Sequence, residues 1–417
     1  MNKDYSISPD VSSTYEAILG ASDVRSGLDF IEADNENTMA DQIEITEIAA
    51  PTFHEQVRGA YFKQRLEQLG LMHIQTDEIG NVSGIRPGKG NGPRLMVSAH
   101  LDTVFPEGTD LKVKEVNGRY MGPGISDDGR GLAVLLSLAR AFREADIQTE
   151  GDIVFCATVG EEGLGNFRGA RAIFHEGHDL DGFITIEPGK PTRTTYMAMG
   201  AHRYNIAYKG PGGHANSGFG TPSAVHALGR AIARISDLEP PELPRTVFTV
   251  AVVSGGTAVN AIAAEANMSI DMRSSSNEEL AKLEEKVITI VHEACKAENE
   301  RWGKRDDIAV EITTLCSRPA GAQSPDDRIV QAALAAAEAI GFEPVLSNPG
   351  NTDANVPITL GVPALALGGG GAHGRVHTLE EWFDPTDAYY GVQKIFLTMI
   401  GLVGIHHRTE PLLPRRT

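Results

Sequence analysis

Cysteine is scarce in this sequence, with three residues in 417, at positions 156, 295 and 316. None of the three has the close spacing of a redox or metal-binding pair, and their number is too small for a disulfide framework. We therefore expect reduced thiols, most of them buried.

Positive charge and long apolar runs are also in short supply. Lys and Arg total 37 against 56 Asp and Glu, and the resulting formal charge of -19 repels nucleic acids and anionic membranes. No run of about 18 apolar residues occurs, as a membrane span requires. The first residues, Met1 to Ser6, lack the basic and then apolar order of a signal peptide. We expect a cytoplasmic protein with a small-molecule partner and no nucleic-acid or membrane partner.

The patterns along the chain predict an α/β protein with an insertion. Strands and helices alternate after about residue 73 and again towards the C-terminus, as in a sheet that collects ligands at its strand ends. In between, the order is strand, helix, strand, strand, helix, strand, which is the ferredoxin-like order. The expected parts are a first segment of the α/β domain at 1–198, an inserted domain at 199–315 and a second segment of the α/β domain at 316–417.

The N-terminal part is less informative. Apolar spacing predicts two helices between residue 26 and about residue 70. Residues 1 to about 25 carry no pattern that we interpret.

Acidic residues and histidines stand in short motifs next to several predicted strands. Zinc accepts imidazole nitrogen and carboxylate oxygen, and a pair of ions needs a bridging carboxylate with further ligands on each side. The motifs together supply such a set: His100-Leu101-Asp102-Thr103-Val104, Gly122-Pro123-Gly124-Ile125-Ser126-Asp127-Asp128-Gly129, Gly160-Glu161-Glu162-Gly163, Ile186-Glu187-Pro188-Gly189 and Val376-His377-Thr378.

Single motifs have simpler interpretations. His100 and Asp102 would lie on one side of a strand end, where solvated His and Asp are common. Asp127 and Asp128 precede a helix, so both could be N-caps instead of one cap and one bridging ligand.

The pair Glu161 and Glu162 is harder to explain without a cation. Adjacent carboxylates at the end of a buried strand repel each other unless a proton or a cation separates them. One glutamate could bind metal while the other accepts a proton from a water molecule.

In this order and context, the motifs resemble the M20 family of metallopeptidases, which includes tripeptide aminopeptidases, glutamate carboxypeptidases and related deacylases. The resemblance covers almost the whole chain from about residue 40. It implies a zinc-exopeptidase-like α/β catalytic domain with an inserted ferredoxin-like α+β lid and dimerisation domain. It also implies two Zn²⁺ per subunit, with Co²⁺ or Mn²⁺ as alternatives, and a homodimer formed through the lid.

The resemblance further implies the metal ligands. His100, Asp127 and Glu187 would bind one zinc. Asp127, Glu162 and His377 would bind the other, so Asp127 would be the bridge.

Other roles follow from the same resemblance. Glu161 would be the general base that acts on water, Asp102 would stand behind His100, and the peptide bond between Asp127 and Asp128 would be cis.

Three residues of the insertion match lid positions. His214, in Gly210-Pro211-Gly212-Gly213-His214, would help to hold the oxyanion in the partner subunit's active site. Asn260 and Arg273 would contact the substrate, Arg273 through a carboxylate. The stretch Asn351-Thr352-Asp353 resembles a family loop near the second metal.

We therefore predict a dinuclear-zinc exopeptidase that hydrolyses amide bonds of di- and tripeptides. An N-acyl amino acid deacylase on the same scaffold is the main alternative, because its metal residues would be the same. A metal-binding protein without catalysis is a further alternative. Glu161 argues against it, since burying a second carboxylate without a partner costs several kcal/mol.

Overall fold

The computed structural model describes residues 5–303 and 307–416. They form two compact units: an outer unit that ends at Met197 and resumes at Ala322, and an inserted unit from Ala198 to Gly321. The sequence placed the second boundary at residue 315, which lies inside strand β14 (Ala309–Arg318). The ladder of β14 with its neighbour continues to Arg318, so the inserted unit ends later than expected.

The outer unit contains a mixed sheet of eight strands. Their order is β1 (Met72–Thr76), β2 (Val82–Arg86), β6 (Asp152–Thr158), β3 (Arg94–His100), β7 (Gly182–Glu187), β16 (Ala364–Gly368), β8 (Arg193–Thr195) and β15 (Val345–Leu346). The neighbours β6, β3, β7 and β16 are parallel. Their carboxyl ends therefore meet at one edge of the sheet, where α/β proteins collect ligands.

A second, smaller sheet joins segments that are distant in the sequence. Its order is β17 (Ala372–Gly374), β18 (Trp382–Asp384), β5 (Arg119–Met121) and β4 (Lys114–Val116). Pairing of Trp382 with Met121 brings the segment after His377 next to the loop before Asp127.

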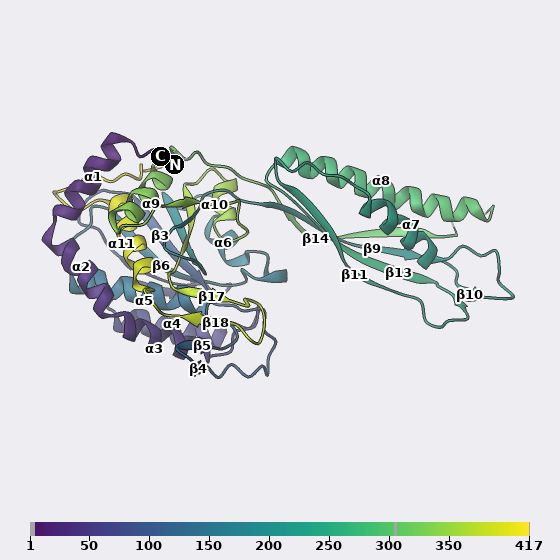
Figure 1. Cartoon of the computed structure of the whole chain (residues 1–417), viewed down its shortest axis with the longest axis horizontal. Coiled ribbons are helices and arrows are strands. Elements are labelled where there is room, and N and C mark those ends of the chain that lie inside the picture. The colour runs from purple at the N-terminus through teal and green to yellow at the C-terminus, as the bar shows by residue number, and fades with distance from the viewer. Residues whose placement is uncertain (1–4, 304–306, 417) are drawn as a thin grey trace. The chain divides into compact units, whose positions relative to one another are not determined.

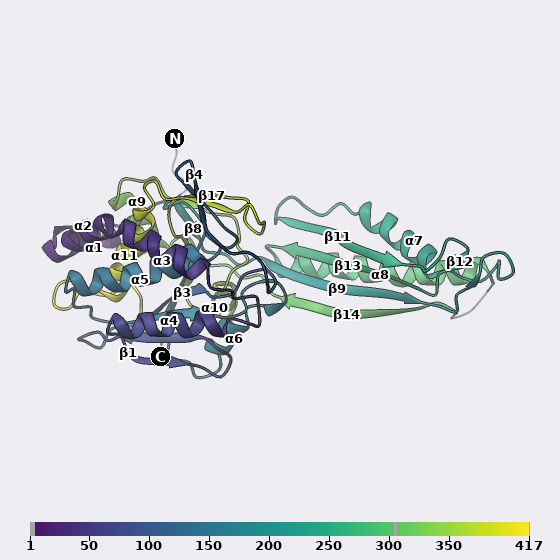
Figure 2. The same ribbon diagram turned by 90° about the horizontal axis from the view of Figure 1, so that it is seen from below.

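The helices of the outer unit pack on the large sheet and on one another. They are α1 (Pro9–Gly20), α2 (Ser22–Ala33), α3 (Asn35–Thr46), α4 (Gln56–Gln68), α5 (Gly129–Glu144), α6 (Arg168–Ile173), α9 (Arg328–Ala339), α10 (Asn355–Thr359) and α11 (Tyr389–Val403). In Figures 1 and 2 the purple N-terminal helices lie beside the yellow α11, and α1 and α2 contact α11 directly. The two ends of the chain thus share one hydrophobic core.

Helix α1 lies where the sequence suggested no element. Val11, Tyr15 and Ile18 form its buried face, at the spacing of helix turns. The Tyr15 hydroxyl donates a hydrogen bond to the main-chain oxygen of Ala332 in α9 (2.7 Å). This face has the helical period, but three apolar residues over about two turns are a weak sequence signal.

The inserted unit has the ferredoxin-like arrangement. Its main elements are β9 (Gly200–Lys209), α7 (Ala224–Ser236), β11 (Thr246–Gly255), β13 (Glu265–Ser274), α8 (Asn277–Arg301) and β14, and two short strands are β10 (Gly213–His214) and β12 (Ala261–Ile262). The sheet order β11-β13-β9-β14 is antiparallel throughout. Figure 1 shows α7 and α8 on one face of this sheet, where they form a core of their own. The predicted order of elements is confirmed.

The structure also describes the three cysteines and the apolar character of the helices. Cys156, Cys295 and Cys316 are all buried, and none of them forms a disulfide within the described part of the chain. Among the described residues, none of the helices combines the length and apolar character of a membrane span.

Lys394 of α11 leads to a prediction on stability. It is fully buried, and its Nζ donates hydrogen bonds to the main-chain oxygen of Arg193 (2.7 Å) and to Oγ1 of Thr194 (2.8 Å). Burial, and then the positive charge of Arg193, lower the pKa of Lys394 to about 7. Its pKa in an unfolded chain is about 10.4. Between these pH values the unfolded chain binds a proton that the folded chain does not, so unfolding becomes less favourable as the pH rises.

We predict that the difference in the free energy of unfolding between the natural protein and Lys394→Met changes with pH. It should rise in favour of the natural protein by roughly 1 kcal/mol per pH unit between about pH 7 and pH 9. Urea unfolding followed by circular dichroism at several pH values measures this difference. Lys296→Met, at an exposed lysine, is the control and should show no such trend. A difference that does not change with pH would contradict the prediction.

Candidate metal centre

His100 and Glu187 end two neighbouring parallel strands. In the register of β3 and β7, Ser98 is paired with Thr185, and two more residues along each strand bring His100 beside Glu187. Both side chains are buried, with exposed fractions of 1% and 7%. The sheet thus sets a histidine and a carboxylate side by side at its carboxyl edge.

The loop between β5 and α5 supplies Asp127 and Asp128 with different surroundings. Asp127 Oδ1 lies 2.9 Å from His100 Nε2. Asp128 caps α5 by accepting a hydrogen bond from the main-chain N–H of Gly131 (2.9 Å), and it accepts another from that of His100 (3.1 Å). The peptide bond between the two aspartates is cis, as the family resemblance implied. Asp128 is therefore a helix cap, and Asp127 faces the histidine.

His377 approaches the same aspartate from another segment. Its Nε2 lies 2.8 Å from Glu162 Oε1 and 3.2 Å from Asp127 Oδ2. Hydrogen bonds with Asp127 and then Glu162 raise the pKa of His377 to about 10. The two oxygens of Asp127 thus face two different histidines, as a carboxylate that bridges two cations would.

The chemistry of this cluster fits divalent metal ions. One ligand atom each from His100, Asp127 and Glu162 lies within 4.8 Å of the others. Oε1 of Glu187 is buried and has no hydrogen-bond partner among the described residues, so a cation would satisfy it. Imidazole and carboxylate are the donors that zinc accepts.

The charges of the cluster also favour a bound cation. Burial raises the pKa of Glu187 to about 8, opposed by His100 and assisted by the carboxylate of Asp127. Burial also raises the pKa of Glu161 well above its usual value, and the charges of Glu187 and Glu162 add to this. A cation among these groups would stabilise their charged forms.

Asp102 supports the site through both its main chain and its side chain. His100 Nδ1 lies 2.9 Å from the main-chain oxygen of Asp102 and 3.7 Å from its Oδ1. The carboxylate instead accepts hydrogen bonds from the main-chain N–H groups of Glu161 (3.0 Å) and Glu162 (3.1 Å) and from the hydroxyl of Thr52 (2.8 Å). Asp102 therefore holds both the histidine ring and the backbone of the two glutamates.

Buried residues that the sequence patterns did not single out also reach this region. Arg58 of α4 donates hydrogen bonds to the main-chain oxygens of Leu101 (2.7 Å) and Ile48 (2.6 Å). Glu381 accepts hydrogen bonds from the loop that carries Asp127. Charged residues are seldom fully buried, and no spacing pattern marks either of them.

Asp353 lies in the stretch that resembles a family loop. It is fully buried, and its Oδ2 accepts a hydrogen bond from the hydroxyl of Thr158 (2.6 Å) at the end of β6. Its charge adds to the shifts that raise the pKa of Glu161 and Glu187, behind burial as the main cause. Asp353 thus belongs to the surroundings of the cluster.

Two of the predicted lid residues lie together in the inserted unit. His214 of β10 is exposed, and its Nδ1 accepts hydrogen bonds from the main-chain N–H groups of Asn216 (3.2 Å) and Ser217 (3.4 Å). The main-chain oxygen of Asn260 accepts one from Ala215 (2.9 Å). With Nδ1 as an acceptor, the neutral form of the ring carries its proton on Nε2, for which the described residues provide no acceptor.

Arg273 is not part of this pair. It lies opposite Ala201 near the start of β9, whereas His214 follows the end of β9 at Lys209. At about 3.3 Å per residue, these positions are roughly 25 Å apart along the strand. The Nε of Arg273 donates a hydrogen bond to Asp271 (2.7 Å) on the sheet.

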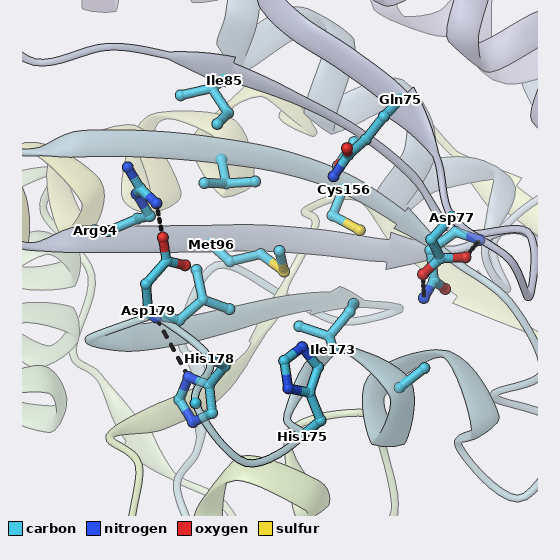
Figure 3. Close-up of a pocket in the computed structure, with 16 residues that line it drawn as sticks. Gln75, Asp77, Ile85, Arg94, Met96, Cys156, Ile173, His175, His178 and Asp179 are labelled. Atoms are coloured by element: carbon cyan, nitrogen blue, oxygen red, sulfur yellow. Dashed lines mark hydrogen bonds and ion pairs between the residues drawn. The ribbon is translucent and has the colours of Figure 1, made fainter.

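A separate cleft of about 470 Å³ lies against the outer sheet (Figure 3). Arg94 and Met96 of β3 line it, while Leu95 and Val97 point to the opposite face and join the core with α5 and α11. Arg94 forms an ion pair with Asp179 in this cleft. None of the predicted site residues lines it, so it is distinct from the candidate metal centre.

Known proteins of similar sequence or fold include hydrolases. Succinyl-diaminopimelate desuccinylase of Legionella pneumophila is 28% identical over 249 residues, which cover 55% of this chain and 66% of that protein. The match thus spans just under two thirds of the relative's length. Aminopeptidase PepT from Bacillus cereus has a similar structure, with a TM-score of 0.71 and 23% identity over 87% of this chain and 97% of that one.

Another solved structure is described as a dinuclear metal binding peptidase from the M20 family, from Bacillus subtilis. It has a TM-score of 0.66 and 16% identity, over 89% of this chain and 99% of that one. At these identities the structural matches establish a shared fold. The pattern of peptidase family M20/M25/M40 matches residues 96–400, well over half of the chain. The chain therefore belongs to peptidase family M20/M25/M40.

Proposed function

We propose that this protein is a dinuclear-zinc exopeptidase that hydrolyses amide bonds of di- and tripeptides. The observation that carries the proposal is the position of Asp127, whose two carboxylate oxygens face His100 and His377. His100, Asp127 and Glu187 would hold one ion, and Asp127, Glu162 and His377 the other. The unpartnered oxygen of Glu187 supports this assignment.

The bound ions would act as Lewis acids and lower the pKa of water near the scissile carbonyl. The protein's own groups would do the rest. Glu161 adjoins the ligand Glu162 and is not needed as a ligand, so we assign it the transfer of a proton from water to the leaving amine. Hydrogen bonds from its main chain and that of Glu162 to Asp102 hold it in place.

The inserted unit would serve as a lid and dimerisation domain. We propose that His214 of the partner subunit donates a hydrogen bond to the developing oxyanion, helped by the free Nε2 proton. Asn260 would contact the substrate beside it. Arg273 would bind a carboxylate of the substrate through its guanidinium group.

An N-acyl amino acid deacylase is the second candidate function. The observation that favours it is the 28% identity to a protein named as a desuccinylase. Both candidates use the same residues, so only the substrate distinguishes them. The predicted cytoplasmic location remains a prediction.

A substrate panel tests the proposed function. The protein is stripped of metal, supplied with Zn²⁺, Co²⁺ or Mn²⁺, and incubated with di- and tripeptides beside N-acetyl and N-succinyl amino acids. We expect hydrolysis of peptides with free N-termini. Turnover of the acylated amino acids alone would replace the peptidase assignment with the deacylase one.

Replacing the proposed general base separates catalysis from metal binding. We predict that Glu161→Gln lowers kcat by about 10²- to 10⁴-fold, the usual contribution of a general acid or base, while Zn²⁺ binding changes by less than about fivefold because Glu161 is not a ligand. Steady-state kinetics and Zn²⁺ titration measure both quantities. Glu176→Gln, at an exposed glutamate, is the matched control. Full activity of Glu161→Gln would remove this residue from the mechanism.

The edge strand β11 suggests where a dimer would form. Val252 and Val253 are exposed on this strand, with exposed fractions of 59% and 56%, and β11 has a neighbour on one side only among the described strands. Such apolar edges pair with other chains unless they are protected. We predict that the double variant Val252→Lys and Val253→Lys is monomeric by light scattering after size exclusion.

The natural protein and the control Val225→Lys, on the exposed side of α7, should remain dimers in the same measurement. A monomeric natural protein would contradict the proposed homodimer. If the double variant remains a dimer, the interface does not lie at β11.

A further inference from the structure

Glu381 occupies a buried position that the proposed ligands do not account for. It follows His377 by four residues, lies directly before β18 and has no exposed surface. Its main-chain N–H donates a hydrogen bond to the main-chain oxygen of Thr378 (3.1 Å). The short turn after His377 therefore ends at Glu381, and the two residues are fixed relative to each other.

The Glu381 carboxylate accepts four hydrogen bonds from the loop that carries Asp127. Oε1 accepts from the main-chain N–H of Ser126 (2.8 Å), from the Ser126 hydroxyl (2.6 Å) and from the main-chain N–H of Asp127 (3.0 Å). Oε2 accepts from the main-chain N–H of Gly124 (3.0 Å). In addition, the main-chain oxygen of Glu381 accepts from Gly122 (3.0 Å).

This loop has little other regular structure to hold it. Residues 122–128 belong to no helix or strand, and Gly124 has a φ of 78°, in the left-handed region that favours glycine. Several main-chain N–H groups of the loop converge on one carboxylate. An ionised carboxylate that accepts such hydrogen bonds binds them more strongly than a neutral acceptor would.

We propose that Glu381 is a positioning residue for the metal centre, which fixes the Asp127 loop relative to His377. The two segments are 254 positions apart at Asp127 and Glu381, and one side chain joins them. Asp127 is thereby presented between the two histidines before any ion binds. The inference rests on the metal centre of the proposed function, and it concerns how tightly that centre holds its ions.

The variant Glu381→Gln tests this role at almost unchanged side-chain size. A glutamine has one oxygen and one NH₂ group, and the NH₂ group cannot accept a hydrogen bond from an N–H donor. At least one of the bonds to the loop is therefore lost. Glu380→Gln is the matched control, because Glu380 is the exposed neighbour and pairs with Arg375 instead of the loop.

Two measurements on the full chain report the metal centre itself. Competition with a chromophoric chelator gives the dissociation constant of Zn²⁺, and the visible spectrum of the Co²⁺ form reports ligand geometry. For Glu381→Gln we expect Zn²⁺ binding weaker by about 10- to 100-fold and a changed Co²⁺ spectrum. For Glu380→Gln we expect the values of the natural protein.

Thermal unfolding of the metal-stripped proteins separates positioning from general stability. If Glu381→Gln melts at a lower temperature but its folded form binds Zn²⁺ as tightly as the natural protein, the positioning role is overturned. If Glu381→Gln does not fold, Zn²⁺ binding is measured on Ser126→Ala instead. This variant removes one of the four hydrogen bonds to the Glu381 carboxylate and keeps the three main-chain donors. Weaker Zn²⁺ binding by folded Ser126→Ala supports the role, and unchanged binding overturns it.

The outcomes also distinguish this inference from the proposed function. If the natural protein binds neither Zn²⁺ nor Co²⁺, this result contradicts the proposed metal centre and therefore also the role of Glu381. Tight binding by the natural protein and by both variants would leave the metal centre in place and remove only Glu381 from its support.

Discussion

The convergence of buried carboxylates on one edge of the outer sheet is the constraint on which the site depends. Asp127, Glu161, Glu162 and Glu187 repel one another there, and burial makes the repulsion stronger. Such a cluster is stable only with imidazolium, protons or cations among the carboxylates. The two histidines that face Asp127 provide part of the balance, and divalent ions would provide the rest.

Backbone hydrogen bonds to further carboxylates keep this cluster in place. Asp128 accepts from the main chain of His100, and Asp102 accepts from the main chain of Glu161 and Glu162. Each of these acceptors lies next to or close to a proposed ligand in the sequence. The acidic composition of the motifs therefore serves two purposes, since some carboxylates face the cluster and others hold the chain that carries it.

Much of this arrangement is readable from the sequence because the motifs follow strands. Parallel strands place their ends at one edge, so His100 and Glu187 had to lie close together once β3 and β7 were neighbours. The division of roles between Asp127 and Asp128 was implied by the family resemblance alone, because their place before the helix is also compatible with two caps. Helix α1 was not predicted from the sequence, because its buried face, which runs from Val11 to Ile18, is only about two turns long.

The sequence by itself determined the α/β class, the ferredoxin-like insertion and the donor types of the site, because periodicity and residue chemistry are local properties. Only the tertiary structure decided that Asp102 accepts a hydrogen bond from the backbone of Glu161, and that Glu381 accepts hydrogen bonds from the Asp127 loop. It also decided that Arg273 lies far along the sheet from His214. These are contacts between segments distant in the chain. Their partners are set by strand register and packing, which leave no pattern at the residues themselves.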